Sequence, residues 1–294
     1  MVAVATNPVS RETVELGSPL PPPLATRTIV VANQKGGVGK TTTAVNIASA
    51  LARGGLRVLL MDLDPQGNAS TALGIEHRTG VPGSYEVLLQ QTPIAEVAQR
   101  SPEAENLFVV PATIDLAAAE IELVPQVARE QRLKKSVRRF LDAEPVDYVI
   151  FDCPPSLGLL TLNALVAASE ILIPIQCEYY ALEGVTQLMR TIQLVREELN
   201  PDLELSTVLL TMFDARTKLS SQVGEEVRNH FPEQTLLTLI PRSVRLSEAP
   251  SYGTTVLGYD PRSVGAKAYL KAASEIARRG AGLDGYSARR GRSA

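Results

Sequence analysis

The residues best suited to chemistry form one short run, Lys35-Gly36-Gly37-Val38-Gly39-Lys40-Thr41-Thr42. Glycines let backbone N–H groups turn inward around phosphate oxygens, and a lysine supplies a cation for the same oxygens. An aliphatic stretch precedes the run and a segment of helical period follows it, which is the context of a nucleotide-binding phosphate loop. We expect Lys40 to reach the β- and γ-phosphates and the Thr41 hydroxyl to ligate Mg²⁺.

The loop departs from the usual G-x-x-x-x-G-K-[ST] pattern, because Gln34 replaces its first glycine and Lys35 adds a second lysine. In this it resembles the deviant Walker A box of the ParA/MinD group of P-loop ATPases. In that group the additional lysine reaches across a dimer interface to the nucleotide of the partner subunit. The resemblance therefore gives Lys35 a catalytic role on the partner's phosphates, with an ordinary solvated lysine as the alternative.

Two carboxylates follow the next aliphatic run, in the segment Met61-Asp62-Leu63-Asp64-Pro65-Gln66. Carboxylates at the carboxyl end of a parallel strand fall beside the phosphate loop, because ligands bind at that edge of the sheet. In the ParA/MinD group this D-x-D-P-Q segment positions the attacking water, and the resemblance assigns that catalytic role to Asp64. Alternation along the strand favours Asp64 over Asp62 as the exposed carboxylate. A cap on the turn toward Gly67 is the alternative role for Asp64.

A third carboxylate, Asp152, ends the apolar run 146–151 and is followed by Cys153. An apolar strand that ends in aspartate matches the Walker B pattern, in which the carboxylate holds Mg²⁺ directly or through water. Cys153 has no neighbouring base in the sequence, which favours a packing role over a nucleophilic one. Since no residue suggests another phosphoryl acceptor, water is the expected nucleophile.

Two segments in the C-terminal half, 210–219 and 240–253, closely resemble the matching segments of chromosomal ParA (Soj) partition ATPases. The resemblance covers about residues 27–277. It implies that Pro241 and Arg242 lie near the adenine ring and complete the nucleotide site.

The same resemblance gives Arg216 and Arg245 the role of binding DNA without sequence preference. Arginine contacts to phosphate suit such binding, because the DNA backbone is the same at every sequence. Ordinary solvated surface is the alternative for both side chains.

The implied protein is an ATP hydrolase that binds ATP and Mg²⁺. The family closes as a homodimer around two nucleotides, and the dimer then holds double-stranded DNA non-specifically. A ParB-type centromere-binding protein would stimulate hydrolysis and so release the protein from DNA, in chromosome or plasmid partition. The expected location is the cytoplasm, in association with the nucleoid.

Other classes of protein stay open at this point. A MinD-like membrane-cycling ATPase would end in an amphipathic helix, but residues 282–294 hold one aliphatic residue larger than alanine, so no membrane partner is expected. A nitrogenase iron protein would need cluster-ligating cysteines, and Cys153 and Cys177 lack that context. An ATP-dependent interaction module with little hydrolysis is a further alternative, against which Asp64 argues.

The elements that must position these residues alternate along the chain, as in βαβ units of a parallel sheet. We predict a single doubly wound α/β domain with helices on both faces of a mostly parallel sheet. The expected strands are 28–32, 57–61, 107–110, 148–151, 171–175, 206–211 and 236–240. The expected helices are 40–53, 115–142 with a break near Pro125, 157–168, 182–199, 218–230 and 263–279.

Composition and charge set the outer limits. With 45% hydrophobic residues, the 294-residue chain can bury a sizeable core. We expect a flexible Pro-rich arm over 1–26, the ATPase domain over 27–279 and a basic flexible tail over 280–294. The formal net charge is −3, and residues 278–294 sum to +4, which leaves −7 on the rest. An acidic body argues against strong DNA binding in all nucleotide states, so binding would depend on a few arginines doubled by dimerisation.

Overall fold

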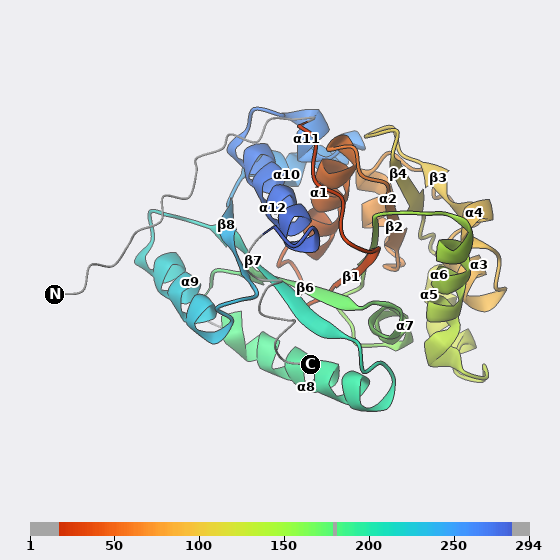
Figure 1. Cartoon of the computed structure of the whole chain (residues 1–294). Helices are drawn as coiled ribbons and strands as arrows, with labels where there is room; N and C mark the ends of the chain where they lie inside the picture. Colours follow the sequence, from red (N-terminus) through yellow and green to blue (C-terminus); the bar gives the residue numbers. More distant parts are fainter. Residues whose placement is uncertain (1–17, 179–180, 284–294) are drawn as a thin grey trace.

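The computed structural model describes residues 18–178 and 181–283. Its centre is an eight-stranded sheet with the order β3-β4-β2-β5-β1-β6-β7-β8, parallel except for the pairing of β3 with β4 (Figure 1). The strands are β1 (Arg27–Val31), β2 (Val58–Asp62), β3 (Gln99–Arg100), β4 (Leu107–Val110), β5 (Tyr148–Asp152), β6 (Glu170–Gln176), β7 (Glu204–Phe213) and β8 (Thr235–Pro241). The predicted doubly wound α/β fold is confirmed.

Helices cover both faces of this sheet (Figure 1). One face carries α1 (Lys40–Arg53), α2 (Asn68–Ala72), α10 (Val244–Glu248), the 3₁₀ helix η2 (Ala249–Tyr252), α11 (Val256–Tyr259) and α12 (Val264–Gly280). The other carries α3 (Ser84–Leu89), α4 (Ile94–Val97), α5 (Leu116–Glu122), η1 (Arg129–Gln131), α6 (Arg132–Ala143), α7 (Leu159–Ala167), α8 (Ala181–Glu198) and α9 (Lys218–His230). None of the described helices is long and apolar enough to cross a membrane.

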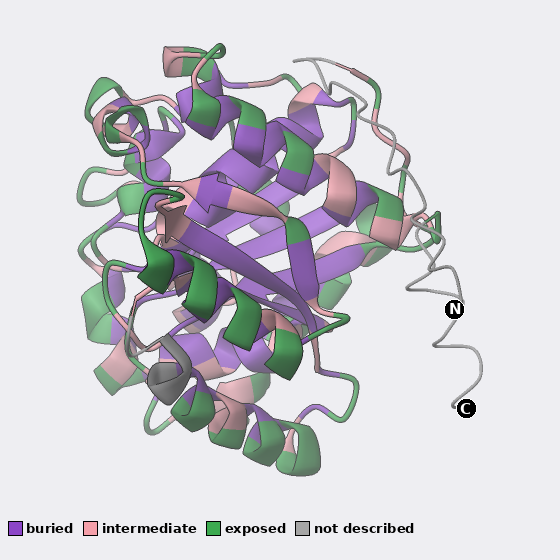
Figure 2. Ribbon diagram, turned by 90° about the vertical axis from the view of Figure 1, so that its left-hand side faces the viewer, coloured by how far each residue is buried: buried purple, intermediate pink, exposed green. Residues whose placement is uncertain are grey.

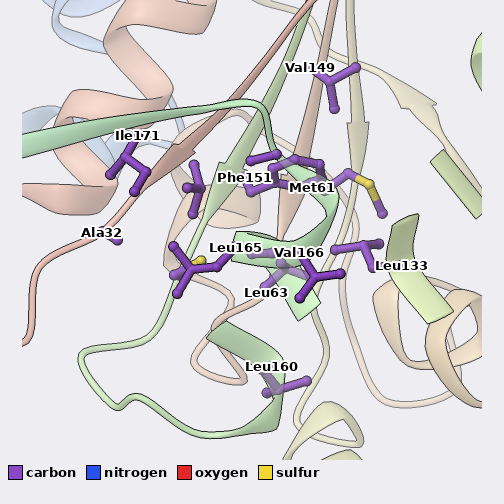
Figure 3. Packing of buried hydrophobic residues seen from close by; sticks show 14 of the residues in the cluster. Ala32, Met61, Leu63, Leu133, Val149, Phe151, Leu160, Leu165, Val166 and Ile171 are labelled. Carbon is purple, nitrogen blue, oxygen red and sulfur yellow. The ribbon is translucent and has the colours of Figure 1, made fainter. Parts of the chain in front are cut away.

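The core consists of two apolar layers, one on each face of the sheet. The central strands β1, β2 and β5 are buried at every position, which explains why three or four consecutive residues of each are apolar (Figure 2). Met61, Phe151 and Leu165 illustrate the packing between strands and α7 in the first layer (Figure 3). Because both faces are packed, the carboxyl ends of the strands are held as a fixed frame for the loops that leave them.

The described part of the predicted N-terminal arm lies along the body of the protein. The Leu20 backbone N–H donates to the Gly54 carbonyl at 3.0 Å, and the Leu24 N–H donates to the Gly280 carbonyl at 3.0 Å. Leu20 also packs against the apolar layer of α1. Residues 1–17 of the predicted arm and residues 284–294 of the predicted tail lie outside the described residues, so the proposed domain boundaries stay predictions.

Candidate nucleotide and phosphate site

The glycine-rich loop lies between β1 and α1, at the carboxyl edge of the sheet. Gly37 and Gly39 have φ values of 75° and 89°, a region that glycine enters without strain. A Cβ atom added at Gly36, Gly37 or Gly39 would meet no protein atom within 4 Å. The loop therefore borders open space. Its glycines are explained by the backbone conformation and by the close approach of a ligand to the backbone, and not by packing against other protein atoms.

Two polar side chains that the sequence did not single out anchor this loop. The Asn33 side-chain amide donates to the Pro174 carbonyl on β6 at 2.9 Å and accepts from the Lys35 N–H at 3.0 Å. The Thr211 hydroxyl on β7 donates to the Val38 carbonyl at 2.9 Å. Since Asn33 and Thr211 are buried, these contacts fix the loop against the sheet from both ends. Asn33 lies just after β1 and Thr211 lies near the end of β7, so the carboxyl ends of strands were the available signal.

The two loop lysines have different surroundings. Lys40 is 8% exposed, and its Nζ donates to the Lys35 carbonyl at 3.3 Å. Burial lowers the pKa of Lys40, while the nearby carboxylates of Asp152 and Asp64 oppose that shift. The Lys40 ammonium is thus a desolvated cation beside carboxylates, ready to bind an anion of higher charge.

Lys35 instead points to Glu178, with 3.3 Å between its Nζ and Oε2 of that carboxylate. Oε1 of Glu178 lies 3.9 Å from Nη2 of Arg242 and accepts a hydrogen bond from the Gln176 amide. One carboxylate therefore contacts two of the residues expected at the nucleotide, Lys35 and Arg242. Sequence reasoning missed Glu178, because 143 residues separate it from Lys35.

Asp62 and Asp152 end neighbouring strands and lie opposite each other in the pairing of β2 with β5. Both carboxylates are fully buried. Burial raises the pKa of Asp62 to about 7. Burial, followed by the charge of Asp62, raises the pKa of Asp152 well above its usual range, while the Thr41 hydroxyl and the Lys40 ammonium oppose this.

Within the described residues, neither carboxylate oxygen of Asp152 has a hydrogen-bond partner. A buried carboxylate without partners is costly unless a cation or water satisfies it. The donor set at this position, the Asp152 carboxylate and the Thr41 hydroxyl, consists of oxygen atoms, which Mg²⁺ prefers. The described residues contain no cluster of three or more ligating side chains able to hold a metal alone. The arrangement therefore fits a Mg²⁺ ion that takes its remaining ligands from phosphate and water.

The two carboxylates of the D-x-D segment differ little in exposure, contrary to our expectation of an exposed Asp64. Residues two apart in a strand face the same side, so alternation does not distinguish them. Asp64 is 9% exposed and Asp62 is 0% exposed, so the carboxylate expected to be exposed is itself largely buried. Asp62 accepts hydrogen bonds from the Asp64 N–H at 3.1 Å, from the Ser70 N–H at 2.8 Å and from the Ser70 hydroxyl at 2.7 Å. Asp62 is thus engaged within the protein.

Asp64 accepts one hydrogen bond, from the Gln66 N–H at 3.0 Å, and its backbone carbonyl accepts from the Gly67 N–H at 2.9 Å. The turn-capping role is therefore present in this structure. It occupies one oxygen of the carboxylate, Oδ1, which leaves Oδ2 for a water molecule.

Of the two residues expected near adenine, Pro241 ends β8 and Arg242 directly follows it. The Arg242 N–H donates to the Phe213 carbonyl at 3.1 Å, which ties the end of β8, at Pro241, to the end of β7. Met212 has a φ of 51°, an uncommon conformation for a residue with a Cβ. Such strain is concentrated at ligand-binding edges, and here it bends the chain at the end of β7.

A cavity of about 260 Å³ borders the start of α1 on the other face of the sheet from α7. Its lining includes Thr41 and Thr42 of α1, Asn68 and Thr71 of α2, and Pro250 of η2. Thr41 and Thr42 therefore have free space beside them, while the packed strands lie beneath α1.

The two arginines expected to bind DNA are exposed but already paired. Arg216 is bidentate on Asp214, with distances of 2.9 Å and 2.7 Å, and its guanidinium lowers the pKa of Asp214 to about 2. Arg245 lies 3.0 Å from Glu248 and 3.6 Å from Asp260, over the ring of Tyr259. Arg216 follows β7 and Arg245 follows β8, and these two strands are neighbours in the sheet.

The cysteines have no role in this site. Both are buried, and burial raises the pKa of Cys177 to about 11 and that of Cys153 well above its usual range. Neither thiol is activated as a nucleophile, which agrees with the expected packing role of Cys153.

Comparison with known proteins gives a consistent picture. The sequence model of the AAA domain family AAA_31 matches residues 26–205. The sporulation initiation inhibitor protein Soj of Bacillus subtilis is 54% identical over 252 residues, which cover 86% of this chain and 98% of Soj. The chromosome partitioning protein ParA of Myxococcus xanthus is 53% identical over 253 residues, covering 86% of this chain and 88% of that protein.

Among solved structures, cobyrinic acid a,c-diamide synthase of Mycobacterium smegmatis with bound ADP and magnesium is 41% identical, with a TM-score of 0.74. The match covers 86% of this chain and 95% of that one. The same synthase has also been solved with a bound ATP analogue and magnesium.

Proposed function

Since the chain belongs to the ParA/Soj family of chromosome-partitioning ATPases, we propose that it is a Mg²⁺-dependent ATPase whose nucleotide state controls its hold on DNA. One observation carries the proposal: Lys35, Lys40 and the buried carboxylate of Asp152 lie together at an open glycine loop. Within the described residues, that carboxylate has no hydrogen-bond partner. The lysines can neutralise phosphate charge, the carboxylate can bind the metal, and the open loop leaves room for the nucleotide.

In this proposal the N–H groups of the loop 35–42 and the Lys40 ammonium hold the β- and γ-phosphates of ATP. Thr41 and Asp152 hold Mg²⁺, Asp152 directly or through water, and the bound ion neutralises charge on the phosphates. Pro241 and Arg242 flank the adenine ring. ADP or an ATP analogue together with magnesium is bound by the Mycobacterium smegmatis relative, which supports this assignment.

Asp64 orients the attacking water through its carboxylate. Phosphoryl transfer to water needs positioning and charge stabilisation rather than a covalent step, and this chain offers the corresponding groups. The Asp64 N–H donates to Oδ1 of Asp62 at 3.1 Å, which fixes the backbone from which the Asp64 carboxylate projects.

Lys35 acts in a homodimer, on the phosphates of the partner subunit. Its contact with Glu178 is half exposed, so the cost of leaving it is small, on the order of 0–1 kcal/mol. A triphosphate carries more charge than one carboxylate and can draw Lys35 away from Glu178. Dimerisation would then depend on the γ-phosphate.

The dimer holds double-stranded DNA through Arg216 and Arg245, whose exposed guanidinium groups exchange carboxylate partners for backbone phosphates. A ParB-type centromere-binding protein stimulates hydrolysis and returns the protein to the free state, which associates only transiently with the nucleoid in the cytoplasm. The Myxococcus xanthus relative at 53% identity is named a chromosome partitioning protein, so we prefer this role over the synthase named for the relative at 41%.

The substitution Asp64→Ala tests the proposal. The variant should bind ATP, form a dimer and stay on DNA, while phosphate release falls by at least about 100-fold, as when a water-positioning group is lost. Light scattering gives the mass, and a phosphate sensor gives the rate. A matched control is Asp202→Ala, an exposed carboxylate in the loop before β7. Full hydrolysis by the Asp64 variant would refute the assigned role, and a monomer with ATP would refute the coupling to dimerisation.

A further inference from the structure

His77 is one of the two histidines of the chain and lies in the loop between α2 and α3. Its imidazole is half-buried and contacts the short helix α2. That helix begins directly after Gly67, three residues beyond Asp64, the residue proposed to orient the attacking water. A side chain at this place can fix the position of the Asp64 carboxylate without touching the nucleotide.

A chain of hydrogen bonds leads from His77 to the backbone of Asp64. The Thr71 hydroxyl donates its single proton to the Gly67 carbonyl at 3.1 Å. The Thr71 oxygen therefore accepts from Nε2–H of His77, over a distance of 2.9 Å. The Gly67 N–H in turn donates to the Asp64 carbonyl at 2.9 Å. The imidazole is thus linked through two residues to the backbone that carries the Asp64 carboxylate.

The imidazole also fills the space beside Gly67. This glycine has a φ of 62°, in the left-handed region that residues with a Cβ rarely adopt. A Cβ atom added there would lie 2.8 Å from Nδ1 of His77 and 2.9 Å from the Ala112 carbonyl. The turn that follows Asp64 is therefore enclosed between His77 and the chain that leaves β4, and close packing on two sides restricts its movement.

The buried side of the same turn is held by other groups. The Ser70 N–H and hydroxyl donate to Asp62 at 2.8 Å and 2.7 Å, and the Ala112 N–H donates to the Ser70 hydroxyl oxygen at 3.1 Å. Thr71 lies on the exposed side of α2, where His77 makes the contact. The buried contacts and the His77 contact therefore hold opposite sides of one turn.

The backbone next to His77 is itself anchored. The Ile75 N–H donates to the Ser70 carbonyl at 3.0 Å, which ties the start of the loop to α2. The Gln99 side-chain amide on β3 donates to the Glu76 carbonyl at 2.9 Å. Both contacts lie within two residues of His77, so the imidazole projects from a fixed stretch of backbone.

We propose that His77 is a positioning residue for ATP hydrolysis, whose Nε2–H acts through Thr71 to hold the turn 64–67 in place. This inference rests on the proposed function, in which the Asp64 carboxylate orients the attacking water. Displacement of such a group by about 1 Å can lower a rate by about 100-fold. A looser turn therefore slows hydrolysis, whereas ATP binding depends on the loop 35–42 and is retained.

The experiment measures kcat and KM for ATP hydrolysis by the full chain with Mg²⁺ and non-specific double-stranded DNA. His77→Ala should lower kcat by about tenfold and change KM by less than about twofold, because the contacts to the nucleotide stay. His77→Gln should keep at least about half of the wild-type kcat, since its side-chain N–H can replace Nε2–H. His77→Asn should resemble His77→Ala, because its shorter amide reaches only the place of Nδ1.

The contact with Thr71 is tested by a double variant. Thr71→Val removes the oxygen that accepts from His77 and should itself lower kcat. His77→Ala should then have no further effect in a chain that already carries Thr71→Val, because both changes break the same contact. His230→Ala is the matched control, since it removes the other histidine, which is exposed on α9. This control should leave kcat and KM unchanged.

Three results would overturn the inference: a wild-type kcat in His77→Ala, an equal loss in the glutamine and asparagine variants, or additive losses from His77→Ala and Thr71→Val. Asp64→Ala, measured alongside, separates these results from failure of the proposed function. Lost hydrolysis in Asp64→Ala with a wild-type kcat in His77→Ala would refute the role of His77 alone. Full hydrolysis by Asp64→Ala would refute the proposed role of Asp64, and the role of His77 with it.

Discussion

Individual charged side chains at the proposed ligand edge have protein partners of their own. Lys35 contacts Glu178, Arg216 contacts Asp214, and Arg245 contacts Glu248. Such exposed pairs contribute little to stability and weaken with salt. Phosphates can therefore displace the carboxylates, and the pairs keep the cations oriented until they do.

The sequence was sufficient to identify several residues at the proposed ligand edge, but not the residues that they contact. The glycine loop and Asp152 were predictable, because their local patterns carry the chemistry. Glu178, Asn33 and Thr211 were not, because each acts through a contact with a residue far along the chain. Burial of Asp64 was also missed, since alternation does not separate residues two positions apart and β2 already ends at Asp62.

At this scale the first prediction concerns Lys40→Ala. The ammonium is largely buried at the open glycine loop, so its loss should raise the Kd for ATP by at least about 100-fold, as for removal of a charge-assisted phosphate contact. Calorimetric titration with ATP and Mg²⁺ measures this. Lys271→Ala, an exposed lysine on α12, is the control. Retained ATP affinity would show that the phosphates bind elsewhere.

The second prediction concerns Arg245→Ala. Each lost phosphate contact should lower the slope of log K for DNA against log salt by about 0.9, or about 1.8 for a dimer. The ATP-dependent dimer should persist, because Arg245 contacts only carboxylates and Tyr259 of its own chain in the described structure. Arg138→Ala on α6, on the opposite face of the sheet, should leave the slope unchanged. An unaltered slope for the Arg245 variant would show that Arg245 is an ordinary surface residue that makes no contact with DNA phosphate.

Among the elements, the long ones were predictable and the short ones were not. Helices 40–53 and 218–230 and the strand 107–110 have the expected bounds, and the helix expected over 115–142 is broken around Pro125. The short helices α2, α3, α4, α10 and α11 were missed, because four to six residues carry too little periodicity. Strand β3, of two residues, exists only through its pairing with β4.

One buried carboxylate joins elements that the sequence separates. Glu103, between β3 and β4, accepts hydrogen bonds from Ser49 at 3.0 Å and Arg53 at 2.9 Å on α1, and from the Thr255 N–H at 3.0 Å before α11. It therefore holds the segment that follows the proposed adenine residues against the phosphate-loop helix. Burial opposes its ionisation, but hydrogen bonds from Thr254 and Thr255 and the charge of Arg53 outweigh burial and lower its pKa.

The third prediction is that Glu103→Gln lowers the free energy of unfolding at pH 7 by about 2–4 kcal/mol, because charged hydrogen bonds to a buried carboxylate are lost. The pKa of Glu103 is depressed in the folded state, so its contribution is complete above the ordinary value of 4.5 and is lost as the pH falls through the lower folded value. Urea unfolding at pH 7 and at pH 4 measures both effects.

The difference between wild type and the Glu103 variant should therefore shrink at pH 4. Glu105→Gln, an exposed carboxylate in the same connection, should change stability by less than about 0.5 kcal/mol. A Glu103 variant as stable as wild type at pH 7 would show that the hydrogen bonds from α1 and α11 carry no net stabilisation.

For the molecule as a whole, the charge distribution is consistent with the proposed cycle. The chain carries −3 in total and −7 over residues 1–277, so its overall charge opposes DNA binding by a monomer. In the proposed cycle, two copies brought together by ATP would present twice the number of placed arginines on one assembly. Affinity for DNA would then depend on which nucleotide is bound, because only one state would form the combined surface.

The parallel sheet was predictable at this scale, since aliphatic runs alternating with helical segments allow few other arrangements. The exposure of apolar residues in α5 and the turn after it, such as Ile121 and Val127, was not predictable, because these residues also fit a buried helix and only the packing shows which side remains outside. The position of the arm was not predictable either. Leu20 and Leu24 lie against the ends of α1 and α12 through backbone hydrogen bonds, which no sequence pattern indicates.

The central claim is that nucleotide state controls DNA binding, and a salt titration of DNA affinity with ATP and with ADP tests it most directly. Non-specific double-stranded DNA and Mg²⁺ are present in both series. With ATP we predict tight binding and a steep slope of log K against log salt, with about 0.9 for each phosphate neutralised. With ADP we predict affinity at least about tenfold lower and a shallower slope, since the paired arginine surface is absent. Equal affinities and equal slopes in the two series would contradict the account.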